Sequence, residues 1–167
     1  MIQNRTMANH SFEMLAKSGE FLNIVVNNIT NCVLLLDREM KLQAFNNALK
    51  SIFSNKADED IMYMRCGEAI GCAYQINEAK DCGKTSKCST CELRLAGMES
   101  YLYNKEIYNE HISRPFFNKN KLQEMKDLRF STRSFHFQKE RYIIMIVEDI
   151  TSLVKESTTI PETNPAF

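Results

Sequence analysis

The stretch RYIIMIVEDIT, residues 141–151, decides how this chain is interpreted. Its apolar and β-branched first part has the length and composition of a buried strand. The polar residues 138–140 before it suit a tight connection from another strand at 128–137. A third strand is predicted at 106–116, and Asp149 can cap a helix that begins DITSLVKES. The carboxy-terminal third therefore predicts three antiparallel strands followed by a helix.

The amino-terminal part predicts a helix and then a β-hairpin. Apolar residues at 11–29 fall near helical spacing, which indicates an amphipathic helix. Strands are predicted at 32–36 and 41–45, joined by a polar turn. Asn46 and the asparagine after it can cap a short helix, and a solvated loop is expected at 54–60. The chain therefore begins and ends with strands that can share one sheet.

This order of elements resembles the PAS fold. The resemblance rests on LLLD at 34–37, on Asn46 after the second strand and on VEDIT at 147–151, and it covers residues 21–153. It implies an α+β fold with a five-stranded antiparallel sheet, helices on one face and an N-terminal helix. In PAS proteins the Asp of the last motif caps the connection towards an effector, so the resemblance also implies a sensory role.

The resemblance divides the chain into three parts. Residues 1–20 form an N-terminal helical extension, residues 21–153 form the PAS-like sensory domain, and residues 154–167 form a C-terminal tail. Within the domain, residues 66–91 carry most of the cysteines but little apolar periodicity. We expect this cysteine-rich segment to depend on something other than its own apolar core.

Four cysteines of this segment are the candidate cofactor and metal ligands, and we call them the cysteine set: Cys72, Cys82, Cys88 and Cys91. The last two form a C-x-x-C pair, a spacing that lets two thiolates from one turn approach the same centre. They also precede a segment with helical spacing, and the amino end of a helix favours thiolates through its free N–H groups and partial positive charge.

The cysteine-rich segment resembles a cysteine-bearing subgroup of bacterial PAS sensor proteins. In that subgroup an Arg-Pro-Gly-Glu stretch leads to a first Cys, and a Cys-Gly-(x4)-Cys-x-x-Cys run follows. The matching residues here are Arg65, Gly67, Glu68, Cys72, Cys82, Gly83, Cys88 and Cys91. Cys66 stands in place of the proline and Glu92 in place of a glycine, which makes Cys66 a possible alternative ligand.

Three kinds of chemistry remain open for the cysteine set. Four thiolates can hold an iron-sulfur cluster of the 4Fe-4S type or a tetrahedral zinc ion, and they can also form a thiol–disulfide switch. The uneven spacing favours the cluster, because structural zinc sites often pair two C-x-x-C motifs. The flavin-binding motif of LOV domains is absent, and residues 89–104 contain no histidine that could bind haem.

Composition and missing motifs narrow the function further. Lys plus Arg equals Asp plus Glu at 21 each, so no overall field attracts nucleic acid or an anionic membrane. The amino terminus resembles neither a secretory signal nor a membrane span, which predicts a cytoplasmic protein with reduced thiols. No phosphate-binding loop or hydrolase motif occurs, so we expect a non-catalytic sensor. The expected partners are a second copy, in a homodimer, and a signalling effector such as a sensor kinase.

Overall fold

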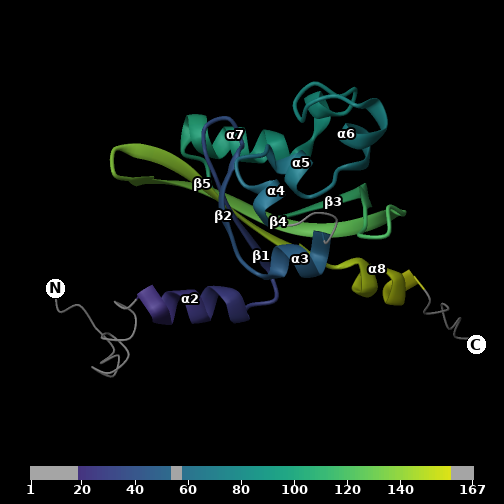
Figure 1. Cartoon of the computed structure of the whole chain (residues 1–167), viewed down its shortest axis with the longest axis horizontal. Coiled ribbons are helices and arrows are strands. Elements are labelled where there is room, and N and C mark those ends of the chain that lie inside the picture. Colours follow the sequence, from purple (N-terminus) through teal and green to yellow (C-terminus); the bar gives the residue numbers. More distant parts are fainter. Residues whose placement is uncertain (1–18, 54–57, 159–167) are drawn as a thin grey trace, which may run out of the picture.

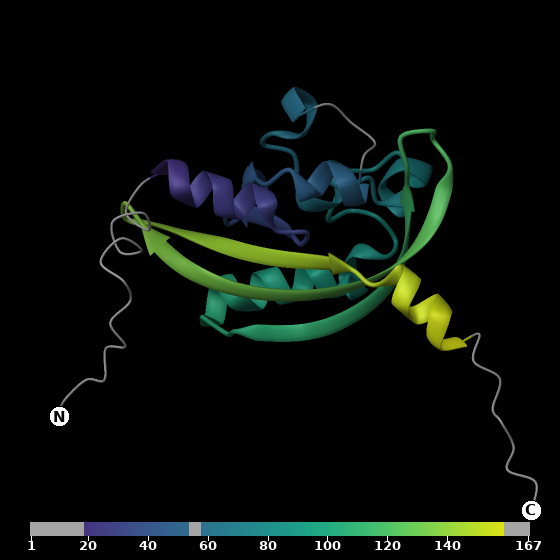
Figure 2. The ribbon, with the colours of Figure 1, turned by 90° about the horizontal axis from the view of Figure 1, so that it is seen from below.

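The computed structural model describes residues 19–53 and 58–158. Five strands form one antiparallel sheet in the order β2-β1-β5-β4-β3. Their bounds are β1 (Cys32–Leu36), β2 (Leu42–Phe45), β3 (Ile107–Phe117), β4 (Gln123–Phe137) and β5 (Glu140–Asp149). The predicted α+β class and five-stranded antiparallel sheet are confirmed. Figure 2 shows the strands as one curved layer, with the last helix projecting beyond the end of β5.

Eight helical segments accompany the sheet in the described part of the chain. They are α2 (Gly19–Asn28), α3 (Ala48–Phe53), α4 (Asp58–Ile61), α5 (Cys66–Ala69), α6 (Ala73–Glu78), the 3-10 turn η1 (Cys88–Thr90), α7 (Glu92–Tyr103) and α8 (Thr151–Thr158). Figure 1 shows α5, α6 and α7 on one side of the sheet, with α2 and α8 outside that layer. The cysteine-rich segment therefore belongs to the helical layer.

The core lies between the central strands and this helical layer. Alternate residues of β1 are buried, as expected when one face of a strand packs inward. Leu34 pairs in register with Met145 of β5, and both are fully buried. On α7, Leu93, Ala96 and Gly97 are buried at helical spacing. Helix α7 therefore forms one side of the core, and the sheet forms the other side.

Asn46 connects the first helix to the sheet. Its side chain is buried; Oδ1 accepts a hydrogen bond from the Val33 amide at 2.9 Å, and Nδ2 donates to the carbonyls of Val26 and Asn31 at 2.8 and 2.9 Å. The prediction that this side chain caps α3 is therefore wrong, because its oxygen and its nitrogen both bond to backbone groups of residues 26–33 and not to the amides of α3. Asn46 instead fixes the end of α2 against β1.

Several element boundaries differ from the sequence-based expectation. Strand β4 begins at Gln123, earlier than predicted, because it continues to pair with β3 as far as Phe117. Helix α4 occupies the end of the predicted loop at 54–60. Helix α8 runs to Thr158, past the predicted start of the tail. The part of the first predicted helix before Gly19 lies outside the described residues.

The VEDIT motif caps the last helix as predicted. Asp149 Oδ1 accepts a hydrogen bond from the Thr151 amide at 3.0 Å, and Asp149 Oδ2 pairs with Lys126 Nζ at 2.8 Å. The Thr151 hydroxyl accepts a hydrogen bond from the Asp127 amide of β4 at 3.0 Å. The start of α8 is therefore bonded to the strand beside β5.

Candidate functional site

The cysteine set surrounds one cavity on the helical side of the sheet. This cysteine cavity has a volume of about 30 Å³ and lies where α5, α6 and the start of α7 meet β3. Five cysteines line it: Cys66, Cys72, Cys82, Cys88 and Cys91. The structure thus brings together all four predicted ligands and the alternative, Cys66. The sixth cysteine, Cys32, is buried in β1 and does not line this cavity.

Short local elements hold these cysteines around the cavity. Cys66 begins α5 and is buried, and Cys72 immediately precedes α6. The backbone of Cys72 forms an isolated antiparallel β-bridge with Phe116 of β3. The Phe117 amide also donates a hydrogen bond to the Gly71 carbonyl at 2.9 Å. Cys91 immediately precedes α7, where the sequence predicted it. Strand β3 therefore anchors one wall of the cavity, while the α7 terminus supplies another.

Gly67 allows the loop that carries Cys82 to approach α5. A Cβ atom added at Gly67 would lie 2.8 Å from Cys82 Sγ, closer than side-chain carbons approach other atoms. The Glu68 carboxylate then accepts a hydrogen bond from the Cys82 amide at 3.0 Å. The Gly-Glu pair that follows Cys66 therefore positions Cys82 through one close approach and one hydrogen bond.

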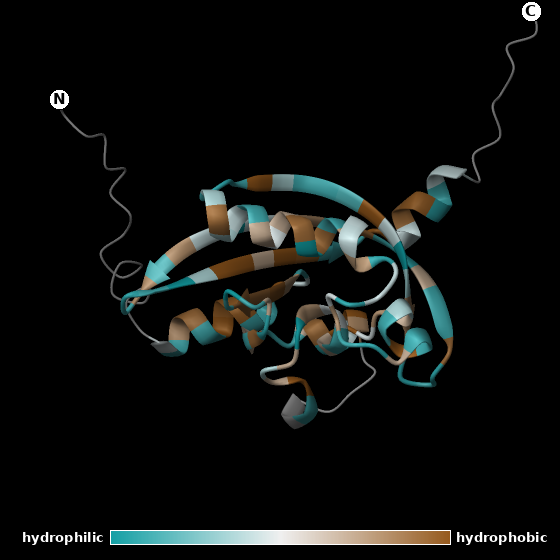
Figure 3. Ribbon diagram, turned by 90° about the horizontal axis from the view of Figure 1, so that it is seen from above, coloured by the Kyte–Doolittle hydropathy of each residue, from teal (hydrophilic) through white to brown (hydrophobic). Residues whose placement is uncertain are grey.

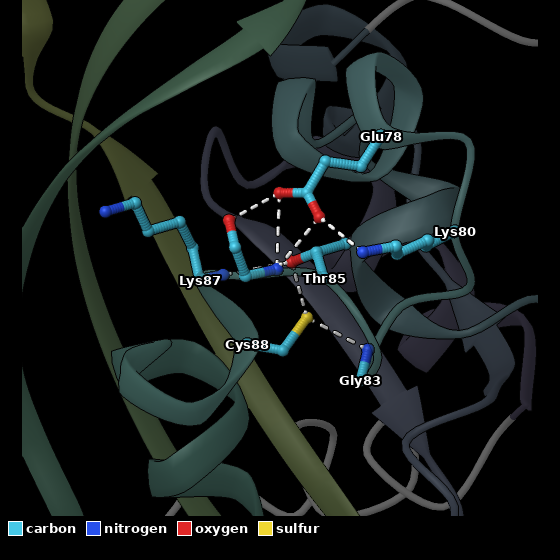
Figure 4. A network of polar contacts seen from close by, with 7 residues as sticks. Glu78, Lys80, Gly83, Thr85, Lys87 and Cys88 are labelled. Carbon is cyan, nitrogen blue, oxygen red and sulfur yellow. Dashed lines mark hydrogen bonds and ion pairs between the residues drawn. The ribbon is translucent and has the colours of Figure 1, made fainter.

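The Cys88 sulfur lies inside a small network of polar groups (Figure 4). The Gly83 amide donates to Cys88 Sγ at 3.1 Å, and the Thr85 hydroxyl lies 2.9 Å from the same sulfur. The Glu78 carboxylate holds the loop from outside by accepting a hydrogen bond from the Ser86 amide at 3.0 Å. Donors that point at a sulfur stabilise its thiolate form.

The cavity cysteines differ in acidity for this reason. Burial acts to raise the pKa of Cys88, but hydrogen bonds from Thr85 and Gly83 outweigh it, so the pKa is lowered from its ordinary value. Burial raises the pKa of Cys82 to about 11, and burial also raises the pKa values of Cys91 and Cys66. As a free thiol, Cys88 would therefore ionise at lower pH than Cys66, Cys82 and Cys91.

Two arginines line the cysteine cavity, and sequence reasoning did not identify them. Arg114 of β3 is 9% exposed; its guanidinium pairs with Glu92 at 3.2 Å and donates to the carbonyls of Lys87 and Thr90, both at 3.4 Å. Arg94 lies on α7 and donates to Met98 Sδ at 2.9 Å. Arg114 follows Ile112 by two positions, so the period-2 pattern of a strand could have placed it on the inward face.

Among residues 19–53 and 58–158, no group of three or more His, Cys, Asp or Glu side chains has the arrangement of a metal-ion site. The same part of the chain has no helix long and apolar enough to cross a membrane. The cysteines converge on a shared cavity, and their role as ligands stays a prediction.

Comparisons with known proteins give matches at the level of structure. No family model matches the chain. No curated protein matches it by sequence either. The PAS domain of nitrogen regulation protein NR(II) from Vibrio parahaemolyticus superposes with a TM-score of 0.56 at 13% identity, over 77% of this chain and 97% of that one.

Two further solved structures are similar. The PAS domain of BvgS from Bordetella pertussis has a TM-score of 0.53 at 14% identity, over 87% of this chain and 97% of that one. A PAS domain from a two-component sensor histidine kinase has a TM-score of 0.52 at 10% identity, over 83% and 97%. With the sheet order and the helical layer described above, these likenesses show that the chain has the PAS fold.

Proposed function

We propose that this chain is a non-catalytic cytoplasmic sensor domain that responds to redox state or oxygen through a 4Fe-4S cluster. The ligands of the cluster are the cysteine set, Cys72, Cys82, Cys88 and Cys91. One observation carries the proposal: cysteines from separate elements of the helical layer line a single cavity. Thiolates are the usual protein ligands of such clusters, and a cluster supplies electron transfer and sensitivity to oxygen.

The surroundings of the cavity suit a thiolate-bound cluster. Its walls include the apolar side chains of Ile70, Leu93 and Phe116, which limit access of water. Hydrogen-bond donors face the Cys88 sulfur, and hydrogen bonds to sulfur and local charge tune cluster potentials. Arg94 and Arg114 supply positive charge against the excess negative charge of four thiolates. Apolar walls, donors to sulfur and compensating cations therefore occur together.

The size of the cavity connects the cluster to a structural response. A volume of about 30 Å³ holds only about one or two water molecules, so a cluster would require the cavity to widen, for example by an outward movement of the loop of residues 79–91. This loop has few buried residues, so such a displacement disturbs little core. Gain or loss of the cluster would then shift the loop and α7 against the sheet.

Zinc is the second candidate, and the same cavity volume favours it. A single ion with four thiolates at about 2.3 Å occupies less space than a cluster. In that case the domain is an interaction module in which zinc takes the place of an apolar core in the cysteine-rich segment.

The lowered pKa of Cys88 favours the third possibility, a thiol–disulfide switch, because the thiolate is the form that attacks a disulfide.

We further propose that the domain acts through a homodimer and a signalling effector such as a sensor kinase. Helix α2 has no buried residue and carries exposed apolar side chains at Leu22, Ile24 and Val25. Figure 3 shows hydrophobic and hydrophilic bands along this helix. Two of the similar solved structures are PAS domains of a nitrogen regulation protein and of a sensor histidine kinase.

Cysteine variants of the full chain, purified without oxygen, test the ligand assignment. We expect Cys88→Ser and Cys91→Ser to lose bound iron and the visible absorption of a cluster. Cys32→Ala is the matched control, because Cys32 does not line the cavity, and it should retain both. Cys66→Ser should retain iron if Cys66 only lines the cavity. Equal iron in all four variants would rule out the cysteine set as ligands.

A further inference from the structure

A second cavity adjoins the cysteine cavity and is lined by basic side chains. Its volume is about 290 Å³, and its basic residues are Arg38, Arg65, Lys84 and Arg94. Met40, Cys82 and Arg94 line both cavities. We call this second site the basic cavity. The proposed function makes no use of it.

Among the described residues, three of these cations form no direct ion pair with a carboxylate. A hydrogen bond from Lys41 chiefly lowers the pKa of Glu39, although the charges of Arg38 and Arg65 also lower it. A hydrogen bond from Lys84 chiefly lowers the pKa of Asp81, although the charge of Arg65 also lowers it. Lys84 pairs with Asp81 at 2.7 Å, and Glu39, the acidic residue of the lining, pairs with Lys41 at 2.7 Å. Among the described residues, Arg38, Arg65 and Arg94 form no ion pair with a carboxylate. Their positive charges converge on one cavity from separate parts of the chain.

Backbone structure holds these arginines in place. Arg38 lies in the β1–β2 turn, which Asp37 closes by accepting hydrogen bonds from the amides of Glu39 and Lys41 at 2.8 and 3.0 Å. The backbone of Arg65 is joined to that turn by an isolated antiparallel β-bridge with Lys41. The basic cavity therefore has a structured rim on this side.

Arg94 completes the cavity from α7. Its Nε atom lies 3.4 Å from the position that a Cβ of Gly83 would take, an ordinary van der Waals distance, so the guanidinium packs beside Gly83. Gly83 has φ of +100°, a conformation that other residues rarely adopt. The backbone conformation of the turn, rather than the space that Arg94 needs, therefore requires a glycine at position 83.

We propose that the basic cavity binds a small organic or inorganic polyanion, either a di- or tricarboxylate or a phosphate compound. Guanidinium groups form paired, charge-assisted hydrogen bonds with both carboxylates and phosphates. A volume of about 290 Å³ is at the lower end of small-molecule pockets, which begin at about 300 Å³. The bound anion would contact Arg94 and Cys82, and thus the wall of the cysteine cavity.

Calorimetric titration of the full chain with citrate and, separately, with inorganic pyrophosphate tests this site. We expect one saturable site for at least one of them, with affinity that falls as salt is raised. Arg38→Gln and Arg65→Gln should each weaken binding by about tenfold or more, the usual effect of losing a hydrogen bond between charged groups. Lys119→Gln removes the same charge from the exposed β3–β4 turn and should leave binding unchanged.

The outcomes separate the two ligand classes and the two proposals. Binding of citrate alone identifies carboxylates, binding of pyrophosphate alone identifies phosphates, and binding of both supports a general polyanion site. Absence of saturable binding by either compound, or equal weakening in Lys119→Gln, would overturn the inference. Iron content is measured on the same samples before and after titration, so a failure of anion binding is distinguished from a failure to hold a cluster.

Discussion

At the scale of single residues, Cys88 and Gly67 show how the cysteine cavity is built. Cys88 lies where an amide and a hydroxyl converge on its sulfur, and Gly67 lies where only a hydrogen atom fits beside Cys82. Spacing and motif predicted Cys72, Cys82, Cys88 and Cys91 as ligands; the structure brings all four to one cavity, and their role as ligands stays a prediction. The sequence did not predict the separate role of Thr85, because a hydroxyl three positions before a cysteine has no distinctive pattern. Contacts of this kind depend on the folded path of the loop.

The acidity of Cys88 leads to a prediction about alkylation. In the reduced, metal-free protein, Cys88 should react with iodoacetamide faster than Cys82 or Cys91 near pH 7.5. Its pKa is lowered while those of Cys82 and Cys91 are raised, so a larger fraction of Cys88 is in the reactive thiolate form at a given pH. Thr85→Val should move the rise of the Cys88 rate to higher pH, because it removes a stabilising donor. Peptide mass spectrometry measures each site, and faster labelling of Cys82 would contradict the assignment.

Gly67→Ala tests the close approach of Cys82. The added methyl group would lie 2.8 Å from Cys82 Sγ, so the sulfur must shift, either by rotation of the Cys82 side chain or with the loop. We expect a loss of about 1–3 kcal/mol in unfolding free energy, as for overpacking of a core, together with reduced iron binding. Gly19→Ala is the matched control, since no atom lies within 4 Å of its added carbon. Urea unfolding of both variants measures the difference, and equal stability would show that Gly67 has no such constraint.

At the scale of elements, the strands were more predictable than the cysteine-rich segment. Strand β1 has the predicted ends, because an apolar run bounded by polar residues indicates a buried strand. The start of β4 could not be predicted, since residues 123–127 are mostly polar and join the sheet by pairing with β3. Helices α5 and α6 are too short for helical periodicity to appear. Helix α6 is positioned by its contacts with β3, and α5 packs against α6.

Arg114 connects β3 to the turn that carries Cys88 and Cys91. Arg114→Ala would leave the carbonyls of Lys87 and Thr90 without this donor, so we expect a loss of about 1–3 kcal/mol in unfolding free energy and faster amide exchange in residues 87–91. Glu92→Gln should cost less than about 1 kcal/mol, because the Glu92 side chain is 54% exposed. Hydrogen-exchange mass spectrometry tests this difference. Unchanged exchange in the Ala variant would exclude Arg114 as the connection.

At the scale of the whole molecule, the PAS fold places the cysteine cavity in the helical layer on the sheet, whereas α2 lies outside that layer (Figure 1). The order of motifs predicted both the sheet and the helical layer. A hairpin, a helical middle part and three further strands, in this order, match the PAS arrangement. The basic cavity could not be predicted, since Arg38, Arg65 and Arg94 come from separate elements. Local sequence patterns do not report such convergence.

The exposed apolar residues of α2 lead to a prediction about assembly. Leu22→Glu combined with Val25→Glu should shift the full chain from dimer to monomer, because it places charge in the proposed interface. These side chains are exposed, so the melting temperature of the monomer should change little. Leu122→Glu, at an exposed site in the β3–β4 turn, should remain dimeric. Light scattering coupled to size exclusion measures the mass, and an unchanged dimer in the double variant would exclude α2 as the interface.

The most direct test of the central proposal is an iron and acid-labile sulfide assay of the full chain, purified without oxygen. A 4Fe-4S cluster predicts about four irons and about four sulfides per chain, with broad visible absorption that bleaches in air. The cysteine set would then be the responsive element of the domain. A colourless protein with one zinc ion per chain, or one with no bound metal, would contradict the account.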